Sequence, residues 1–427
     1  MHRICTGKRK KKRLSALRQK DLFDRERQTA YNNREDLHKG GAARMKKGIL
    51  VLLFCLLLSA CSMPPPAPSP VPPAEETAAP PVPTETELPH EHSYDAETGL
   101  CRTCGSPCPH GEGFSPEGRC LLCGWRCDHG QHDAESACCL RCGAQLWHHF
   151  GIAGRCEGCG REAPLAGEGL PDAYYEPAEH AGQCLLETVT DAEGKEHSIA
   201  LWLPWDYSED GRYNVLILIH GDNGSCRDWT DREQPTARGA VQLCHVYDHM
   251  TEEHLCQPFL VVGVGLEDVA NPAKGERFLK ETLLPYLARS CATWMEGDSP
   301  EQIRAAREHI AIGGLSRGAM LTYRVGLCRC LDVAANFCCF SNADKAGLPD
   351  ALEGEENRNL PIRSYVATLG LQDLPDYARG QRALYELLCS RVERIRDGEN
   401  ARLLEIDEGH NFLMWSASIY DALLLMF

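Results

Sequence analysis

The sequence predicts an α/β fold, in which a mainly parallel sheet carries helices on both faces, preceded by a small cysteine-rich repeat region. Two observations support this fold class. Beyond residue 183, continuous apolar runs of strand length alternate with helical stretches, which is typical of strands buried on both faces of a parallel sheet. Between residues 90 and 160, four Cys-x-x-Cys-Gly segments recur at nearly constant spacing.

Residues 1–61 are a basic extension followed by a signal-peptide pattern. Met45-Lys46-Lys47 precedes the apolar stretch 48–58, which is too short to span a bilayer because about 20 apolar residues are needed. The following Leu58-Ser59-Ala60-Cys61 resembles the lipobox of bacterial lipoproteins. This resemblance implies lipidation of Cys61 and an exported protein anchored at the outer face of the bacterial cell membrane. A plain secretory signal or an anchor helix is the alternative. We interpret residues 1–44 as the product of a start codon assigned too early.

The charge distribution argues against two partner classes. The first 48 residues hold 16 of the 45 Lys and Arg residues and 5 of the 61 acidic residues. The rest of the chain has 29 basic and 56 acidic residues, a balance of −27. Nucleic acids and anionic membrane surfaces need a positive partner, so neither is expected. Residues 62–89 are Pro-rich and predict an extended linker, and residues 161–183 predict a second linker.

The repeats place Cys and His at metal-ligand spacing. Each unit has a Cys-x-x-Cys pair and an upstream ligand set, except that Leu146 occupies one ligand column of the fourth unit, so His149 must substitute or that site is incomplete. The expected ligands are His90, His92, Cys101, Cys104, Cys108, His110, Cys120, Cys123, Cys127, His129, Cys139, Cys142, His148, Cys156 and Cys159.

Zinc binding and disulfide formation are the two interpretations of this Cys and His pattern. Zinc takes four N or S ligands. A segment of about 70 residues with few large apolar side chains cannot form a sufficient hydrophobic core, so a bound metal would supply the missing stability. Disulfides are plausible in an exported protein, but they do not need histidine, which recurs in the same column of all four units. We therefore predict structural zinc in residues 90–160. What the repeats bind besides metal is not predicted.

The hydrolytic chemistry is expected in residues 184–427. Strands are predicted over 184–190, 197–203, 215–220, 259–264, 309–313, 333–340, 362–368 and 402–406, with helices near 278–288, 318–329 and 377–396. Gly314-Leu315-Ser316-Arg317-Gly318 follows one of these strands and precedes a helix, which is the context of a nucleophilic serine on a sharp turn. A Gly-rich turn with an idle serine is the alternative.

Two further residues complete a candidate triad. His410 follows the last predicted strand and serves as the general base, and Asp373 follows the preceding strand and orients the imidazole. Asp376 is the rival for the acid. Singly, His410 could cap a helix and Asp373 could hold a turn. The loop after residue 219 is expected to supply the second oxyanion donor, the backbone N–H of Asp222, beside that of Arg317. His220 is expected to be a packed residue at the strand end.

Four stretches carry a family resemblance. They are 202–207 (Trp-Leu-Pro-Trp-Asp-Tyr), 213–221, 314–318 and Gly409-His410-Asn411-Phe412. Together they resemble the esterase D and feruloyl-esterase group of α/β-hydrolases from about residue 201 to the C-terminus. The resemblance implies Ser316, Asp373 and His410 as the triad, no catalytic cofactor, and ester substrates such as feruloyl or acetyl groups on plant or wall polysaccharides. Arg317 departs from the Met that is more frequent in the family, which affects the acyl pocket.

Two other functions stay open at this point. The chain could be a binding or anchoring protein whose hydrolase domain is degenerate, although an intact triad argues against this. It could also be a serine peptidase of the prolyl-oligopeptidase type, although no propeller is visible upstream. The sequence leaves open whether the ten cysteines after residue 183 form disulfides.

Overall fold

The computed structural model describes residues 93–95, 100–102, 129–140, 143–167, 169–230, 232, 242–341 and 348–427. The signal peptide, Cys61, the Pro-rich linker and most ligands of the first two repeats lie outside the described residues. The described part belongs to a single compact unit that runs from Pro89 to Phe427. Within the described residues, no helix combines the length and the apolar character that crossing a membrane requires.

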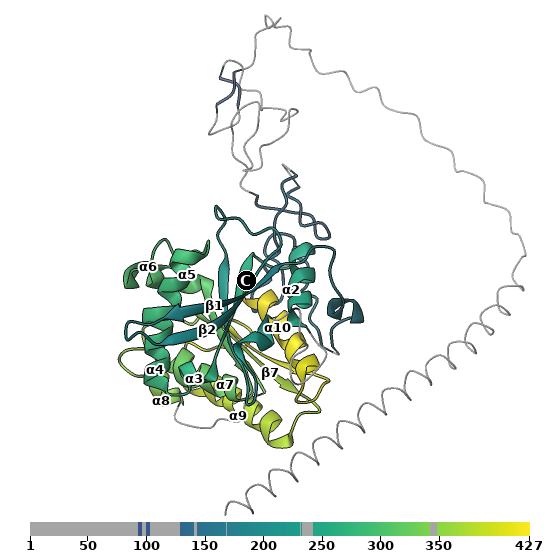
Figure 1. Ribbon diagram of the computed structural model, residues 1–427. Coiled ribbons are helices and arrows are strands. Elements are labelled where there is room, and N and C mark those ends of the chain that lie inside the picture. Colours follow the sequence, from purple (N-terminus) through teal and green to yellow (C-terminus); the bar gives the residue numbers. More distant parts are fainter. Residues whose placement is uncertain are drawn as a thin grey trace, which may run out of the picture. The chain divides into compact units, whose positions relative to one another are not determined.

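An eight-stranded sheet forms the centre of this unit (Figure 1). The strand order is β1-β2-β4-β3-β5-β6-β7-β8, and strands β3 to β8 are parallel while β2 pairs antiparallel with both β1 and β4. The strands are β1 Gln183–Thr190, β2 Glu196–Leu203, β3 Asn214–Ile219, β4 Phe259–Val264, β5 Ile310–Leu315, β6 Asn336–Phe340, β7 Ser364–Gly370 and β8 Ala401–Ile406. The predicted mainly parallel sheet is thus confirmed, and each strand overlaps its predicted range.

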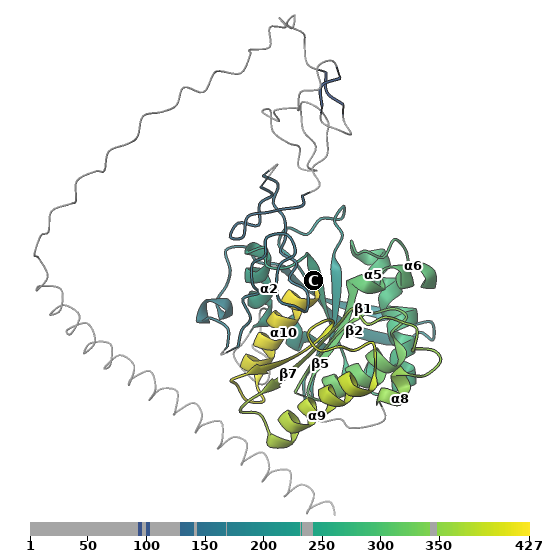
Figure 2. The ribbon, with the colours of Figure 1, turned by 180° about the vertical axis from the view of Figure 1, so that it is seen from behind.

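Helices cover both faces of the sheet, as Figures 1 and 2 show from opposite sides. Alternate residues of β3 enter two different cores: Ile217 packs with the first helix layer, and Leu216 with the second. This two-sided burial is the reason that β3 reads as a continuous apolar run. The first layer comprises α3 Leu266–Val269, α4 Pro272–Arg277, α5 Leu284–Ser290, α6 Pro300–Ala305, α7 Arg317–Leu321, α8 Leu348–Leu352 and α9 Pro375–Arg391. The second comprises α2 Leu243–Glu252 and α10 Phe412–Met426.

Residues 161–183 differ from the linker that the sequence predicts. Leu170 and Tyr174 are buried in the core on the α2 and α10 side of the sheet, and a short 3-10 helix spans Asp172–Tyr175. The backbone N–H of Ala166 donates to Oδ1 of Asp421 in α10 at 2.7 Å. Glycine and proline made this segment resemble a linker, but Ala166, Leu170 and Tyr174 are buried in the core.

The third and fourth repeats have the same local structure. In each, the N–H of the final glycine donates to the carbonyl of the first cysteine, Gly143 to Cys139 at 2.9 Å and Gly160 to Cys156 at 2.8 Å. Gly143 and Gly160 have φ values of +73° and +76°, a conformation that glycine adopts without a steric penalty. The motif therefore ends in glycine because the turn after the second cysteine requires a left-handed residue.

Candidate active site

Ser316 lies on a strained turn between β5 and α7. Its φ of +54° and ψ of −114° are unusual for a residue with a side chain, and such a conformation costs about 1–3 kcal/mol. The N–H of Ser316 donates to the carbonyl of Phe340 at 2.9 Å, which holds the turn against the end of β6. Ser316 itself is 7% exposed. The sharp turn raises the side chain above the carboxyl-terminal edge of the sheet, as a nucleophile requires.

The glycines of the motif are required by close packing around this turn. A Cβ on Gly314 would lie 2.6 Å from the carbonyl carbon of Gly318 and 2.7 Å from the carbonyl oxygen of Ile219. A Cβ on Gly318 would overlap the Ile219 carbonyl oxygen. Helix α7 therefore crosses directly over the end of β3, and only glycine permits this approach. The spacing Gly-x-Ser-x-Gly follows from this contact.

The loop after β3 lies against the serine. A Cβ on Gly221 would lie 3.4 Å from the Cβ of Ser316. The loop is a tight turn, because the Gly224 N–H donates to the Gly221 carbonyl at 3.2 Å, and Asn223 has the positive φ that such a turn favours. The side chains of Arg317 and Asp222 approach to 3.5 Å, so an ion pair joins the two residues whose N–H groups are the predicted oxyanion donors.

His220 holds this loop with both ring nitrogens. Its Nδ1 lies 2.7 Å from the Gly221 carbonyl oxygen, and its Nε2 lies 3.1 Å from the backbone N–H of Leu266, the first residue of α3. A ring that carries its proton on Nδ1 satisfies both partners. In a trans peptide the carbonyl and the next N–H point in opposite directions, so the bond to Gly221 directs the Asp222 N–H away from His220. His220 is buried as the sequence suggested, but its role extends beyond packing.

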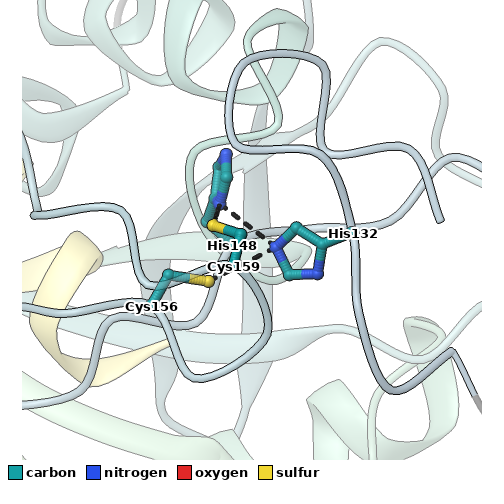
Figure 3. A group of neighbouring side chains, drawn as sticks. All are labelled: His132, His148, Cys156 and Cys159. Atoms are coloured by element: carbon teal, nitrogen blue, oxygen red, sulfur yellow. Dashed lines mark hydrogen bonds between the residues drawn. The ribbon is translucent and has the colours of Figure 1, made fainter. Parts of the chain in front are cut away.

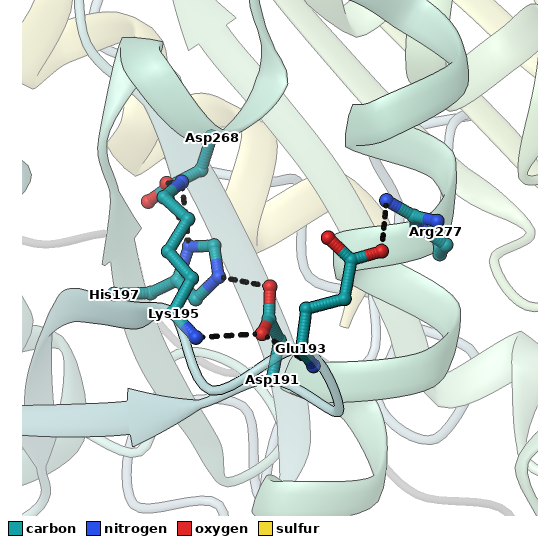
Figure 4. A network of polar contacts seen from close by, with 6 residues as sticks. All are labelled: Asp191, Glu193, Lys195, His197, Asp268 and Arg277. Atoms are coloured by element: carbon teal, nitrogen blue, oxygen red, sulfur yellow. Dashed lines mark hydrogen bonds and ion pairs between the residues drawn. The ribbon is translucent and has the colours of Figure 1, made fainter.

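A polar network fixes α3, the second partner of His220, to the β1–β2 hairpin (Figure 4). The Nδ1 of His197 in β2 lies 2.7 Å from Oδ1 of Asp268 in α3, and its Nε2 lies 3.1 Å from Oδ2 of Asp191 in the hairpin turn. Lys195 adds an ion pair to Asp268 at 3.0 Å. Since His197 and Asp268 are buried, this network gives α3 a fixed position under the His220 ring.

Asp373 and His410 form a hydrogen-bonded pair. The loop after β7 carries Asp373 and the loop after β8 carries His410, and Asp373 Oδ1 lies 3.0 Å from His410 Nδ1. The Leu374 N–H donates to the same oxygen at 2.6 Å. Burial opposes ionisation of Asp373, but the hydrogen bond to His410 and the nearby Ser341 hydroxyl outweigh it, so the pKa of Asp373 lies below its usual value. An ionised Asp373 keeps the His410 proton on Nδ1 and leaves Nε2 free to accept another.

Asp376, the rival acid, is directed elsewhere. Its carboxylate pairs with Arg379 at 2.6 Å, and its side chain is 87% exposed. Between the two candidates, the geometry favours Asp373.

The start of α10 contacts the residue that follows β6. Ser341 follows β6 directly, and its Oγ lies 3.6 Å from Sδ of Met414. The preceding residue, Phe340, accepts the N–H of Ser316. The loop that bears His410 is therefore joined to the end of β6, the strand next to β5. Ser341 gave no signal in the sequence because it belongs to no motif.

A second group of chemically active side chains lies in the repeats (Figure 3). One ligand atom each from His132, His148, Cys156 and Cys159 lies within 4.8 Å of the others. Burial, together with the charge of Arg161, lowers the pKa of His148 to about 4, so its ring is neutral at pH 7 as a metal ligand must be. Three of these residues were predicted as ligands, whereas His132 was not, because it lies outside the recurring ligand columns.

The expectation for the fourth repeat is corrected by this group. The sequence required His149 to substitute at Leu146 or left the site incomplete, but in the structure His132 of the third repeat brings the fourth candidate ligand atom to this group. His149 is directed away, with Nδ1 3.4 Å from Glu157 and Nε2 3.4 Å from Arg363. Of the other predicted ligands, Cys101, His129 and Cys139 are described but do not join this group, and the rest lie outside the described residues.

All ten cysteines beyond residue 183 carry free thiols.

Comparison with known proteins identifies the fold. No protein-family model matches the chain. The chain is 28% identical over 170 residues to endo-1,4-beta-xylanase Y of Acetivibrio thermocellus. This matched segment covers 39% of the present chain and only 15% of the length of the xylanase. Two solved structures each align with 61% of this chain at a TM-score of 0.52: a protein named FAE, at 23% identity over 94% of its length, and a feruloyl esterase module of Clostridium thermocellum in complex with sinapinate, at 22% identity over 93%. The domain has the α/β-hydrolase fold of these structures.

Proposed function

We propose that this chain is a serine esterase that hydrolyses carboxylic esters, with acyl groups of the feruloyl or acetyl type on plant or wall polysaccharides as its substrates. The observation that carries the proposal is the Asp373–His410 hydrogen bond of 3.0 Å at the sheet edge where Ser316 occupies its strained turn. This arrangement needs no cofactor for ester hydrolysis. The similarity to a xylanase and to a feruloyl esterase module supports the substrate class.

The mechanism follows from the roles of these groups. Nε2 of His410 takes the proton of Ser316 as Oγ attacks the ester carbonyl carbon. The N–H groups of Asp222 and Arg317 stabilise the oxyanion, since a helix begins at Arg317 and the first N–H groups of a helix lack partners within it. His410 then gives its proton to the departing alcohol, which leaves an acyl group on Ser316. Water, deprotonated by His410, then attacks the acyl carbon, and His410 returns the proton to Ser316 Oγ as the bond between Oγ and the acid breaks.

The surroundings of His410 support an aromatic acyl group. The Tyr377 ring lies 5.0 Å from the imidazole, and the Trp415 ring meets it edge-on at 5.1 Å. Beside Asp373, Leu371 and Leu374 are 55% and 53% exposed. An aromatic acid would bury this apolar surface.

The cellular setting is part of the same proposal. Export through the signal peptide and lipidation of Cys61 would hold the enzyme at the outer face of the cell membrane, with residues 62–89 as a tether. Zinc in residues 90–160 would stabilise the repeats without entering the reaction, because four protein ligands close a zinc site to substrate.

Turnover on a substrate panel tests the proposed activity. The panel contains methyl ferulate, an aryl acetate and a peptidyl anilide, each assayed with the wild-type chain and with Ser316→Ala. We expect hydrolysis of the esters, higher kcat/KM for the feruloyl ester, and no turnover by the variant. Cleavage of the anilide alone would indicate a peptidase, and no turnover on any substrate would favour a binding protein.

A further inference from the structure

We infer that His132, His148, Cys156 and Cys159 bind one zinc ion that joins the third and fourth repeats and fastens them to the amino-terminal edge of the hydrolase sheet. The inference does not depend on the esterase activity, because its evidence lies in the repeats and in their contacts with the strand starts.

Three of the distances between the four side chains match a tetrahedral zinc site, and all four ligand atoms lie within 4.8 Å of one another. With Zn–N bonds of about 2.0–2.1 Å and Zn–S bonds of about 2.3 Å, tetrahedral ligands lie about 3.3 Å apart for two nitrogens and about 3.6 Å apart for nitrogen and sulfur. His132 Nε2 lies 3.4 Å from His148 Nδ1 and 3.3 Å from Cys156 Sγ, and Cys159 Sγ lies 3.5 Å from His148 Nδ1 (Figure 3). Two thiolates and two imidazoles are a ligand set typical of structural zinc.

The ligands come from two neighbouring repeats. His132 pairs by a backbone bridge with Cys139 of the third repeat, whereas the other three ligands follow residue 146. Tyr94 pairs with Cys101 of the first repeat by the same kind of bridge and in the same register, so His132 occupies the position that Tyr94 has there. At this position His132 reaches the Cys-x-x-Cys pair of the fourth repeat. Metal binding at this site makes the two repeats one unit.

The residues around the ligands contact the hydrolase at the starts of its strands. The His148 N–H donates to the carbonyl of His254, in the connection between α2 and β4, at 3.1 Å. Arg402, the second residue of β8, donates to the carbonyl of Ile152 at 3.1 Å. Phe150, Ile152 and Cys156 are buried in the same core as α10. The candidate ligand Cys156 thus belongs to the hydrolase core, so metal binding at this site would also stabilise the packing of this part of the core.

The zinc position is remote from the Ser316 site. Arg402 lies at the start of its strand, whereas Ser316 follows the end of the six-residue strand β5. A strand rises about 3.3 Å per residue, so the two edges of the sheet lie roughly 20 Å apart. With four protein ligands and this separation, the ion would stabilise the fold and take no part in ester hydrolysis.

Two other arrangements of these four residues must be distinguished from zinc. The side chains could form a hydrogen-bonded cluster without metal, or Cys156 and Cys159 could oxidise to a disulfide, which an exported protein allows. Neither alternative requires His132 to be a metal ligand, so that residue is the one to replace.

The test compares three variants of the full chain: His132→Ala, His132→Cys and His149→Ala. Elemental analysis gives the zinc content per chain, and thermal unfolding gives the midpoint of the hydrolase. We expect His132→Ala to bind one zinc ion fewer than the wild type and to unfold several degrees lower. His132→Cys should keep the wild-type zinc content because it retains a ligand, and His149→Ala should keep it because His149 is directed at Glu157 and Arg363.

The same samples provide the contradicting outcomes. Wild-type zinc content in His132→Ala, loss of the ion in His149→Ala instead, or thiol titration that finds Cys156 and Cys159 oxidised would each overturn the inference. If His132→Ala does not fold, the zinc content of His132→Cys decides: a loss of one ion there would exclude His132 as a replaceable ligand and contradict the proposed site. Because none of these readouts uses an ester, failure of the esterase assay would leave the zinc result interpretable.

Discussion

His410 Nδ1 lies 3.0 Å from Asp373 Oδ1, although 37 residues separate the two along the chain. Strands β7 and β8 are neighbours and parallel, so the loops that follow them meet at one edge of the sheet. This pair defines which nitrogen of His410 is available to a nucleophile. The nucleophile turn at Ser316 follows β5, at the same edge.

Replacing Asp373 tests whether this pair is catalytic. Asp373→Asn should lower kcat for an aryl ester by about 10³- to 10⁴-fold, because the amide can donate to Nδ1 and stabilise the wrong imidazole tautomer. Asp376→Asn is the matched control and should change kcat less than about threefold, since Asp376 contacts Arg379. Steady-state kinetics on both variants decides between them, and a large loss in Asp376→Asn alone would assign the acid to that residue.

His220 is expected to position the oxyanion loop. His220→Ala removes the bond to the Gly221 carbonyl and frees the Asp222 peptide, so kcat should fall about 10- to 100-fold with little change in KM. His309→Ala is the control, because His309 stacks on Trp294 and contacts Asn214 at the opposite edge of the sheet. It should lower the unfolding midpoint and leave kcat unchanged. Equal kcat values in the two variants would show that His220 contributes to packing and does not position the oxyanion loop.

Asp421 predicts a pH dependence of stability. Burial raises the pKa of this carboxyl to about 7, above its ordinary value of 3.8, although the Ala166 N–H partly opposes the shift. Between these values the folded chain holds a proton that the unfolded chain releases, so the free energy of unfolding falls as pH rises through this range. Asp421→Asn keeps an acceptor for Ala166 and cannot ionise. Its midpoint relative to the wild type should therefore be higher at pH 8 than at pH 5.

Thermal unfolding of both proteins at the two pH values measures this difference. Replacement of the exposed Asp350 by Asn provides the control for the loss of a carboxylate that lies outside the core. A midpoint difference between variant and wild type that does not rise from pH 5 to pH 8 would contradict the prediction.

Cys61 is predicted to anchor the protein. In a bacterial host that processes lipoproteins, Cys61→Ala should move the chain from the membrane fraction to the medium or leave the signal peptide uncleaved. Fractionation followed by immunoblotting distinguishes these outcomes from the unmodified pattern. Cys55→Ala, in the apolar stretch of the same signal peptide, should leave the fractionation unchanged. Membrane association of Cys61→Ala with normal cleavage would exclude the lipid anchor.

The sequence predicted those features that depend on local patterns. Strand β4 was predicted at its observed bounds because both of its faces are buried, which produces six consecutive apolar or small residues. Helix α2 was not predicted. Its buried face includes His245 and Asp248. His245 contacts the Tyr175 carbonyl, while Asp248 accepts from the Gly182 N–H and the Trp202 indole and forms an ion pair with Arg232. Those partners lie far along the chain, so the helix has no simple apolar face in the sequence.

The residues of the candidate sites likewise fall into those that local sequence patterns predicted and those that depend on contacts between distant segments. Ser316, Asp373 and His410 follow strands, and the order of strands in the chain was enough to predict that they share an edge. His132 could not be predicted as a candidate zinc ligand, because its neighbours in the cluster belong to the next repeat and the repeat pattern assigns ligands within a unit. The contact of His220 with Leu266 likewise depends on β3 and β4 being neighbours, which the sequence does not state.

Covalent trapping tests the assignment of Ser316 most directly. The wild-type chain is treated with a fluorophosphonate, which reacts with activated serine, and the adduct is located by intact-mass measurement and peptide mapping. We expect one adduct per chain, on Ser316, formed at the rate at which ester hydrolysis is lost. Ser316→Ala should acquire none, and Ser390→Ala, which removes an exposed serine of α9, should react like the wild type. An adduct on another residue, or ester hydrolysis that persists in Ser316→Ala, would contradict the assignment of Ser316 as the nucleophile.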